Sequence, residues 1–246
     1  MAARFEELAF AATPLGEVSL RRRVEPTLGV DVHEVKLGDE FLMSSLFHDS
    51  EVALAHLGLK ALADSRGGQG WDVLVGGLGL GWTARTVLED DRVASLVVVD
   101  ALAEVIRWHV EDLVPGGAEL AQDPRTRLVH GDFFALARHP DGLDPDMPGR
   151  LFDAVLVDID HTPEHLLHVS HGDLYSVDGL RRAALRLRPG GVFGLWSDDP
   201  PEPRFEAVLG EAFAATSSHV VSFANHLTGG RSACTVYLGT TAPPAG

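Results

Sequence analysis

A glycine-rich turn followed by an acidic residue is the part of this sequence best suited to chemistry. The turn holds Gly76, Gly77, Gly79 and Gly81. A backbone without side chains can approach a ligand closely at such a turn. The next apolar run ends on Asp100, where a carboxylate can accept hydrogen bonds from both hydroxyls of a ribose. The spacing therefore predicts a site for an adenosine-containing cofactor.

Two cofactor classes fit this turn. Residues 79–84 match the G-x-G-x-x-A pattern of nicotinamide sites, and Asp100 follows at the spacing of about 20 residues that such sites use. S-adenosylmethionine fits equally, because the pattern needs no phosphate. Features outside the turn favour S-adenosylmethionine: Asp132 follows the third apolar run, where it can hold an adenine amine, and Asp158 ends the fourth. NAD stays as the alternative.

The elements that position these residues alternate along the chain from Trp71 onward. Apolar runs predict strands near residues 71–76, 95–100, 126–130, 152–158 and 191–196. Helices are expected near residues 81–90, 102–113, 132–138, 174–188 and 203–214. Such alternation predicts a parallel sheet with helices on both faces, and it places the acids along the edge where the strands end.

The last two apolar runs differ from the rest. Residues 219–224 and 232–239 are separated by a short turn that contains glycine, so the two strands must be antiparallel neighbours. We therefore predict an α/β fold: the Rossmann-like, doubly wound sheet of class I methyltransferases, with an antiparallel C-terminal hairpin.

Short β-prone runs separated by turns precede this sheet. A helix should follow them, with Asp49 or Ser50 as its N-cap. We predict an N-terminal β-hairpin domain, residues 1–48, and an α/β catalytic domain, residues 49–246.

The composition is typical of a soluble cytoplasmic protein. Of 246 residues, 20 are Lys or Arg and 36 are Asp or Glu, and the formal net charge of −16 argues against nucleic acid as a partner. The single cysteine, Cys234, excludes an internal disulfide and suits a reducing compartment. No membrane association is expected, because no stretch of about 18 apolar residues is free of charge and the N-terminus has acids where a signal peptide needs a basic flank.

Several stretches resemble the polyamine aminopropyltransferases of the spermidine synthase type, which share the fold of S-adenosylmethionine-dependent methyltransferases. They are VLVGGLGLGWTARTVL, VVVDA, VHGDFF, FDAVLVD and DLYSVDGLRRAALRLRPGGVF. The likeness runs over most of the chain. It implies a transferase that moves an aminopropyl group from decarboxylated S-adenosylmethionine to a small-molecule amine, and it also implies a homodimer.

Matched by position, the resemblance assigns roles to residues of this chain. Asp100 would bind the ribose hydroxyls, Asp132 the adenine amine, and Asp158 would orient or deprotonate the attacking amine. A carboxylate is needed there because a protonated amine is not nucleophilic. The predicted cofactor-binding residues are Gly76, Gly77, Gly79, Gly81, Asp100, Ala101, Gly131, Asp132 and Phe133.

The acceptor side departs from the family pattern. The family's Asp-x-x-Asp is DIDH here, residues 158–161, so a histidine replaces the second acid. Asp160 would lie on the same side of an extended chain as Asp158 and could partly substitute. The predicted catalytic residues are therefore Asp158, Asp160 and His161.

Two further positions depart, since Met43 and Asp49 stand where the family has a glutamine and a tyrosine. These departures leave two alternatives open. One is an S-adenosylmethionine-dependent methyltransferase that acts on a small molecule through the same pocket. The other is a non-catalytic member of the fold that acts as a binding protein.

A histidine-rich segment follows Asp158 and contains His161, His165, His168 and His171. Imidazoles and carboxylates together suit a metal such as zinc, but the spacing is not that of a preformed site, and no metal is expected. We favour a lid over the active site, with His161 as a proton relay, over an ordinary polar loop.

Overall fold

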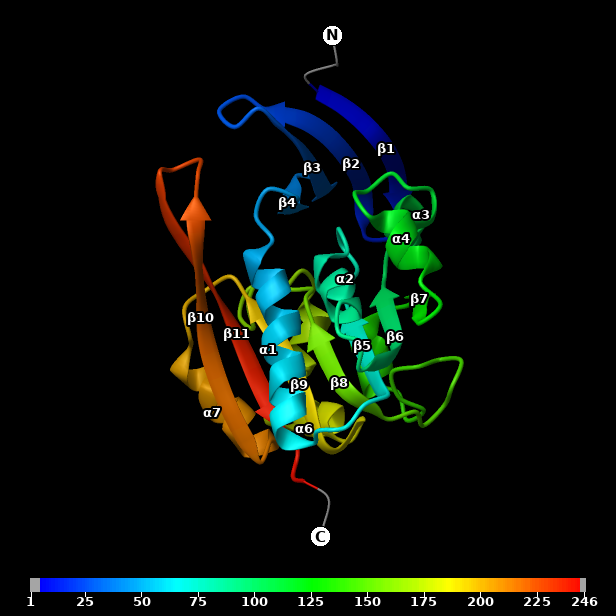
Figure 1. The fold of residues 1–246 in the computed structure, drawn as a ribbon, viewed down its shortest axis with the longest axis vertical. Helices are drawn as coiled ribbons and strands as arrows, with labels where there is room; N and C mark the ends of the chain where they lie inside the picture. The colour runs from blue at the N-terminus through cyan, green and yellow to red at the C-terminus, as the bar shows by residue number, and fades with distance from the viewer. Residues whose placement is uncertain (1–4, 244–246) are drawn as a thin grey trace.

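The computed structural model describes residues 5–243 and contains a four-stranded and a seven-stranded sheet. The smaller sheet lies above the edge at which the parallel strands of the larger sheet end (Figure 1). None of the helices in this part of the chain is long and apolar enough to span a membrane.

The N-terminal sheet is antiparallel, and its strands follow chain order. They are β1 (Phe5–Thr13), β2 (Gly16–Glu25), β3 (Val30–Leu37) and β4 (Glu40–Ser44). Val18, Leu20 and Val35 are buried in the same hydrophobic cluster as Leu54 of helix α1 (Asp49–Ser65). The predicted β region is confirmed. Because the cluster continues past residue 48, the division into two domains there stays a prediction.

The larger sheet has the strand order β10-β11-β9-β8-β5-β6-β7. Its strands are β5 (Trp71–Gly76), β6 (Val93–Asp100), β7 (Thr126–His130), β8 (Phe152–Val157), β9 (Leu187–Ser197), β10 (Ala215–Asn225) and β11 (Gly230–Thr240). Strands β5 to β9 pair in parallel, whereas β11 runs antiparallel to both β9 and β10. The predicted doubly wound sheet with an antiparallel C-terminal hairpin is confirmed.

Helices cover both faces of this sheet. Val73 and Val75 of β5 face a cluster formed with α1, α2 (Trp82–Leu88) and α3 (Ala103–Val110). Leu74 faces a second cluster, formed with α5 (Phe133–Arg138), α6 (Val177–Ala184) and α7 (Pro203–Ala212). All of β8 is buried between the two layers, which explains why every residue of this strand except Asp153 is apolar.

Helix ends differ from the sequence predictions. Helix α1 begins at Asp49, with His48 as an N-cap whose side chain makes no capping bond, so neither Asp49 nor Ser50 is the cap. Helix α6 ends at Ala184, because the chain pairs as β9 from Leu187 onward. The short helix α4 (Gly117–Gln122) was not predicted.

The Arg-Pro-Gly-Gly segment, residues 188–191, lies inside β9, so this strand begins before the range of 191–196 that the sequence predicts. The register between β8 and β9 shifts there, and Gly190 takes a φ of +76°. The Gly190 N–H donates to the carbonyl of Ala242 (2.8 Å). Ala242 lies near the C-terminus, far from Gly190 in the sequence, so the residues around Gly190 could not predict this hydrogen bond.

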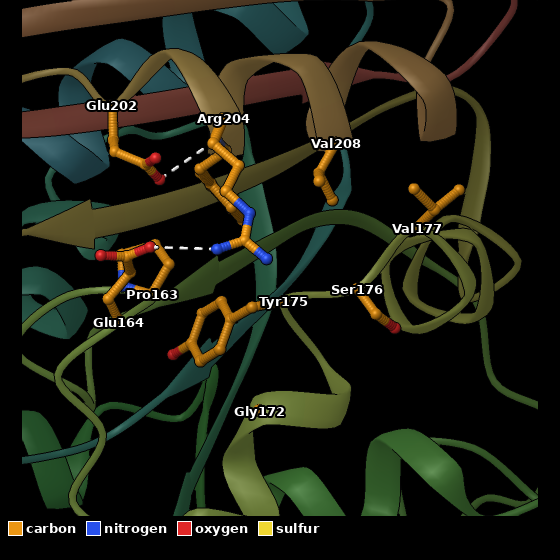
Figure 2. Close-up of a pocket in the computed structure, with 10 residues that line it drawn as sticks. Pro163, Glu164, Gly172, Tyr175, Ser176, Val177, Glu202, Arg204 and Val208 are labelled. Atoms are coloured by element: carbon orange, nitrogen blue, oxygen red, sulfur yellow. Dashed lines mark hydrogen bonds and ion pairs between the residues drawn. The ribbon is translucent and has the colours of Figure 1, made fainter.

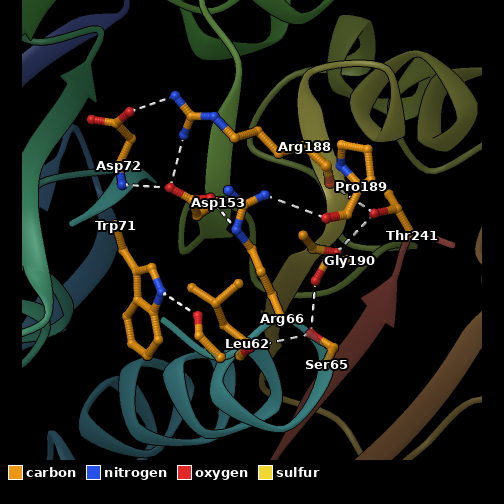
Figure 3. Close-up of polar contacts among 12 residues, drawn as sticks. Leu62, Ser65, Arg66, Trp71, Asp72, Asp153, Arg188, Pro189, Gly190 and Thr241 are labelled. Atoms are coloured by element: carbon orange, nitrogen blue, oxygen red, sulfur yellow. Dashed lines mark hydrogen bonds and ion pairs between the residues drawn. The ribbon is translucent and has the colours of Figure 1, made fainter. Parts of the chain in front are cut away.

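An ionic cluster joins the amino ends of the central strands, at the edge of the sheet away from the N-terminal sheet (Figure 3). The buried carboxylate of Asp153 contacts Arg66 (3.0 Å) and Arg188 (2.8 Å). It also accepts a hydrogen bond from the backbone N–H of Asp72 (2.7 Å). The cluster therefore ties the end of α1 to β5, β8 and β9.

We expect Asp153→Ala to lower the free energy of unfolding by about 3 kcal/mol, because it leaves two guanidinium groups and a buried N–H without their shared partner. Urea unfolding monitored by circular dichroism measures the change. Asp178→Ala is the control, since that exposed carboxylate forms only a 3.7 Å pair with Arg181 and should contribute less than about 0.5 kcal/mol. Equal effects of the two variants would contradict the role of the cluster.

Candidate active site

Two neighbouring cavities lie between the N-terminal sheet and the edge at which β5, β6 and β8 end. The first, of about 440 Å³, opens onto the glycine turn, and we call it the glycine cavity. The second, of about 410 Å³, is the acidic cavity. The residues that line both are Leu42, Met43, Gly79, Asp158, Ile159 and Leu167. Asp158 therefore stands in the wall that the two cavities share.

The turn after β5 forms one wall of the glycine cavity. Gly77 has a φ of +92°, and a Cβ at this position would overlap the carbonyl of Asp158. At Gly79, with a φ of +48°, a Cβ would lie 2.5 Å from the Sδ of Met43. Gly77 has no room for a side chain against the backbone that follows β8. At Gly79 the obstacle is the flexible end of the Met43 side chain, and the positive φ is what favours glycine.

Asp100, the last residue of β6, faces this turn. Its Oδ2 accepts a hydrogen bond from the N–H of Leu78 (2.9 Å), and its Oδ1 accepts one from the N–H of Leu102 (2.8 Å). Burial raises the pKa of the carboxyl, and these bonds oppose the rise. Each oxygen keeps a second lone pair for a hydroxyl donor in the cavity.

His109 of α3 supports the turn from behind and was missed by the sequence analysis as a site residue. Its Nε2 donates to the carbonyl of Gly79 (2.9 Å), and burial lowers its pKa, which favours the neutral ring. A Cβ on Gly81 would lie 2.8 Å from the ring. A buried histidine on an apolar helix face carries no sequence signal for such a role.

Asp158 follows β8 and is held by Thr83. The Thr83 hydroxyl donates to Oδ2 of Asp158 (2.9 Å) and lies 3.4 Å from the carbonyl of Glu51. Burial raises the pKa of Asp158 to about 6, and the bond from Thr83 opposes the rise. A carboxylate that titrates near neutral pH is suited to take up and release a proton.

The acidic cavity combines carboxylates with aromatic rings. Its carboxylates belong to Glu51, Asp158 and Asp198, and its lining contains no lysine or arginine. Its aromatic residues are Phe41, Phe47, Trp82, Trp196 and Phe223. Trp196 is half-buried and lines this cavity. The C-terminal hairpin closes one side, where Phe223 and Phe47 lie 5.7 Å apart between ring centroids.

The solved structures that match this chain include spermidine synthases. The crystal structure of spermidine synthase from Thermotoga maritima matches with a TM-score of 0.70 and 17% identity, over 96% of this chain and 73% of that chain. A spermidine synthase in complex with the transition-state analogue AdoDATO matches with a TM-score of 0.70 and 17% identity, over 96% and 74%. A probable spermidine synthase from Corynebacterium glutamicum matches with a TM-score of 0.63 and 16% identity, over 94% and 79%.

The fold is that of the spermidine synthases. The fold expected from the sequence resemblance is therefore confirmed. No protein-family model matches the sequence, and no curated protein matches it at a significant level.

Within this spermidine synthase fold, the predicted cofactor-binding residues fall into two groups. Those that line the glycine cavity are Gly77, Gly79, Asp100, Ala101, Asp132 and Phe133. Those that do not are Gly76, Gly81 and Gly131. Gly76 makes room for the ring of Phe133, which a Cβ would approach to 2.9 Å, and Gly81 lines the acidic cavity instead.

Asp132 has a structural contact besides its place in the glycine cavity. Its Oδ1 caps α5 by accepting hydrogen bonds from the N–H groups of Phe134 (2.9 Å) and Ala135 (3.1 Å). The cap uses a single carboxylate oxygen, so Oδ2 remains for a donor in the cavity.

Asp160 lines neither cavity, contrary to the expectation from strand alternation. Strand β8 ends at Val157, so the alternation does not continue to residue 160. The Asp160 carboxylate accepts hydrogen bonds from the N–H of Leu167, from Nδ1 of His171 and from the hydroxyl of Tyr175, each at 2.8 Å. It holds the histidine-rich segment in place.

The histidine-rich segment lies against both cavities. Its residues Leu167, His168, Ser170 and His171 line the glycine cavity. His161 lines the acidic cavity, and its Nε2 lies 3.2 Å from a carboxylate oxygen of Glu40 in β4. This position agrees with a lid, which stays a prediction. Within residues 5–243, no three histidine, cysteine or acidic side chains are grouped to hold a metal ion.

A third cavity, of about 400 Å³, lies between this segment and helices α6 and α7 (Figure 2). It shares no lining residue with the other two. Arg204 reaches across it to Glu164 (3.5 Å), and Tyr175 forms part of its wall. It is separate from the candidate site.

We expect Gly77→Ala to lower the free energy of unfolding by about 3 kcal/mol or more, because the new methyl group overlaps the Asp158 carbonyl and the backbone φ is positive. Gly68→Ala is the control that separates the steric overlap from the effect of the positive φ. Gly68 also has a positive φ, +77°, but a Cβ there meets nothing within 4 Å, so we expect a cost of about 1 kcal/mol. Urea unfolding compares them, and similar costs would refute a tight junction at Gly77.

We expect Asp160→Ala to release residues 161–173, because three hydrogen bonds to one buried carboxylate are lost. Hydrogen exchange measured by mass spectrometry should become faster in this segment and stay unchanged in β5 and β6. Tyr175→Phe removes one of the three bonds and should give a smaller effect. Unaltered exchange in the segment would show that Asp160 does not hold it.

Proposed function

We propose that this protein is an aminopropyltransferase-like enzyme, which transfers the aminopropyl group of decarboxylated S-adenosylmethionine to an amine. One observation carries the proposal: Asp158 stands in the wall between a glycine cavity suited to the adenosine co-substrate and an acidic cavity suited to a cation. A base at this boundary can take a proton from an amine in the acidic cavity, while the amine nitrogen faces the carbon next to sulfur of a co-substrate in the glycine cavity.

The glycine cavity supports the choice of co-substrate. Asp100 and Asp132 each keep acceptor capacity toward the cavity, for the ribose hydroxyls and the adenine amine, and Phe133 supplies an apolar surface. None of the lysines and arginines in residues 5–243 lines the glycine cavity. A carboxylate in the ligand would lack a cationic partner there, which favours the decarboxylated form over S-adenosylmethionine itself.

The acidic cavity supports an amine as acceptor. An ammonium group gains from the three carboxylates, and the aromatic residues in the lining suit the methylene groups of an amine. The spermidine synthase in complex with the transition-state analogue AdoDATO has a similar fold, which supports a co-substrate of this kind for this chain.

The residues of this chain would contribute positioning and proton transfer. Decarboxylated S-adenosylmethionine supplies a carbon activated by the adjacent sulfonium. Asp158, held by Thr83, removes the proton that keeps the amine from being nucleophilic. Met43 and Ile159 line the shared wall with apolar groups, which limits water near the carboxylate.

The first test is calorimetric binding of decarboxylated S-adenosylmethionine, methylthioadenosine, S-adenosylmethionine and NAD. We expect preference for the first two. Preference for S-adenosylmethionine would instead support a methyltransferase, and binding of NAD alone would overturn the choice of co-substrate. Binding of none of the four would favour a non-catalytic binding protein.

We expect Asp158→Asn to lower kcat for amine transfer by about 100-fold or more, because the amide cannot take up the proton. Binding of methylthioadenosine should remain, since the substitution is nearly isosteric. Product formation followed by mass spectrometry measures kcat. Unchanged turnover in this variant would reject Asp158 as the base.

A further inference from the structure

A second carboxylate, that of Glu51, lies in the acidic cavity with Asp158. Glu51 is in the first turn of α1, and Ser50 donates a hydrogen bond to its Oε2 (2.8 Å). The hydroxyl of Thr83 bonds to Asp158 and lies against the Glu51 backbone, so it joins the two segments. The sequence analysis gave no sign of this pairing, because acids are common in first helical turns.

Within residues 5–243, no lysine or arginine lines the cavity that contains these two carboxylates. The titratable groups around Glu51 are Asp49 on its own helix, Asp158 after β8, Asp198 after β9 and Cys234 in β11, with His161 also lining the cavity. Burial raises the pKa of Glu51 to about 7, and the charge of Asp158 adds to the rise. Burial raises the pKa of the Cys234 thiol to about 12, so the thiol stays neutral.

We propose that Glu51 is a second catalytic carboxylate, and that Glu51 and Asp158 work as one pair that binds the acceptor ammonium and holds its proton during transfer. The inference rests on the proposed function and extends it in two ways. It assigns the proton of the acceptor ammonium to two residues instead of one, and it states that the amine binds in its cationic form.

The step balances as follows. The ammonium gives one proton to the pair and becomes a neutral amine. A bond then forms between the amine nitrogen and the carbon next to sulfur, while the carbon–sulfur bond breaks and its electron pair goes to sulfur. The product leaves as a secondary ammonium and methylthioadenosine. The proton passes from the pair to solvent, which restores both carboxylates.

This pairing predicts a particular pH profile. The form that binds the ammonium is the doubly ionised pair, and it is lost as the pH falls through about 7 and about 6. The logarithm of kcat/KM should therefore fall with a slope that approaches two in acid. In Glu51→Gln the fall should start near pH 6, its slope should stay at one, and kcat/KM at about pH 8 should be about 10- to 100-fold lower.

Glu89→Gln is the matched control. This glutamate lies just beyond α2, its side chain is 71% exposed, and its carboxylate lies 3.9 Å from Nε2 of His56. Its profile should equal that of the unaltered protein. A Glu51→Gln profile equal to that of the control would overturn the proposal.

A second measurement needs no turnover and separates this inference from the proposed function. Infrared spectra between about pH 5 and pH 8 report protonated carboxyl groups directly. The unaltered protein should lose a carboxyl band in this range that Glu51→Gln lacks. In Asp158→Asn the band of Glu51 should disappear at lower pH, because the charge that raises its pKa is gone.

The two measurements have distinct outcomes. If no amine is alkylated by the unaltered protein but the band is present and lost in Glu51→Gln, the proposed function fails and the proton-holding pair stands. If transfer occurs but no such band titrates, the pair is overturned and the proposed function stands.

Discussion

The close approach of β5 to β8 is the constraint on which the site depends. The N–H of Asp158 donates to the carbonyl of Gly76 (2.8 Å), and the N–H of Gly77 donates to the carbonyl of Val99 (2.9 Å). Gly77 can fit there because it has no Cβ to overlap the Asp158 carbonyl. This junction lies where the strand order reverses, so the turn after β5, the acid after β6 and the acid after β8 meet at one opening.

Charge is the second organising feature, and it is distributed differently at the two edges of the sheet. At the amino ends of the strands, Asp72 and Asp153 are matched by Arg66 and Arg188. At the carboxyl ends, Glu51, Asp158 and Asp198 share a cavity with no lysine or arginine in its lining. Because burial raises the pKa of Glu51 and of Asp158, ionisation of these two makes the folded protein less stable, and a bound cation would relieve that cost.

Much of the glycine cavity could be predicted from the sequence, whereas the acidic cavity could not. The glycine turn and Asp100 are spaced by a local strand-helix-strand unit, so their meeting follows from the pattern of apolar residues. Glu51, Trp196 and Phe223 come from α1, β9 and β10, which meet through packing of distant segments. The position of Asp160 was predicted wrongly from the sequence, because side chains alternate between the two faces only within a strand and β8 ends at Val157.

The sequence by itself determined the fold class, the antiparallel hairpin, and the placing of Gly77, Asp100 and Asp158 at one sheet edge, because apolar periodicity and turn chemistry act over short stretches of chain. The tertiary structure alone decided three other things: that Asp158 separates two cavities, that Glu51 lies with it, and that Asp160 serves the histidine-rich segment. Those outcomes depend on burial and on contacts between residues far apart in the chain, and side-chain pKa values and cavity walls arise only from such contacts.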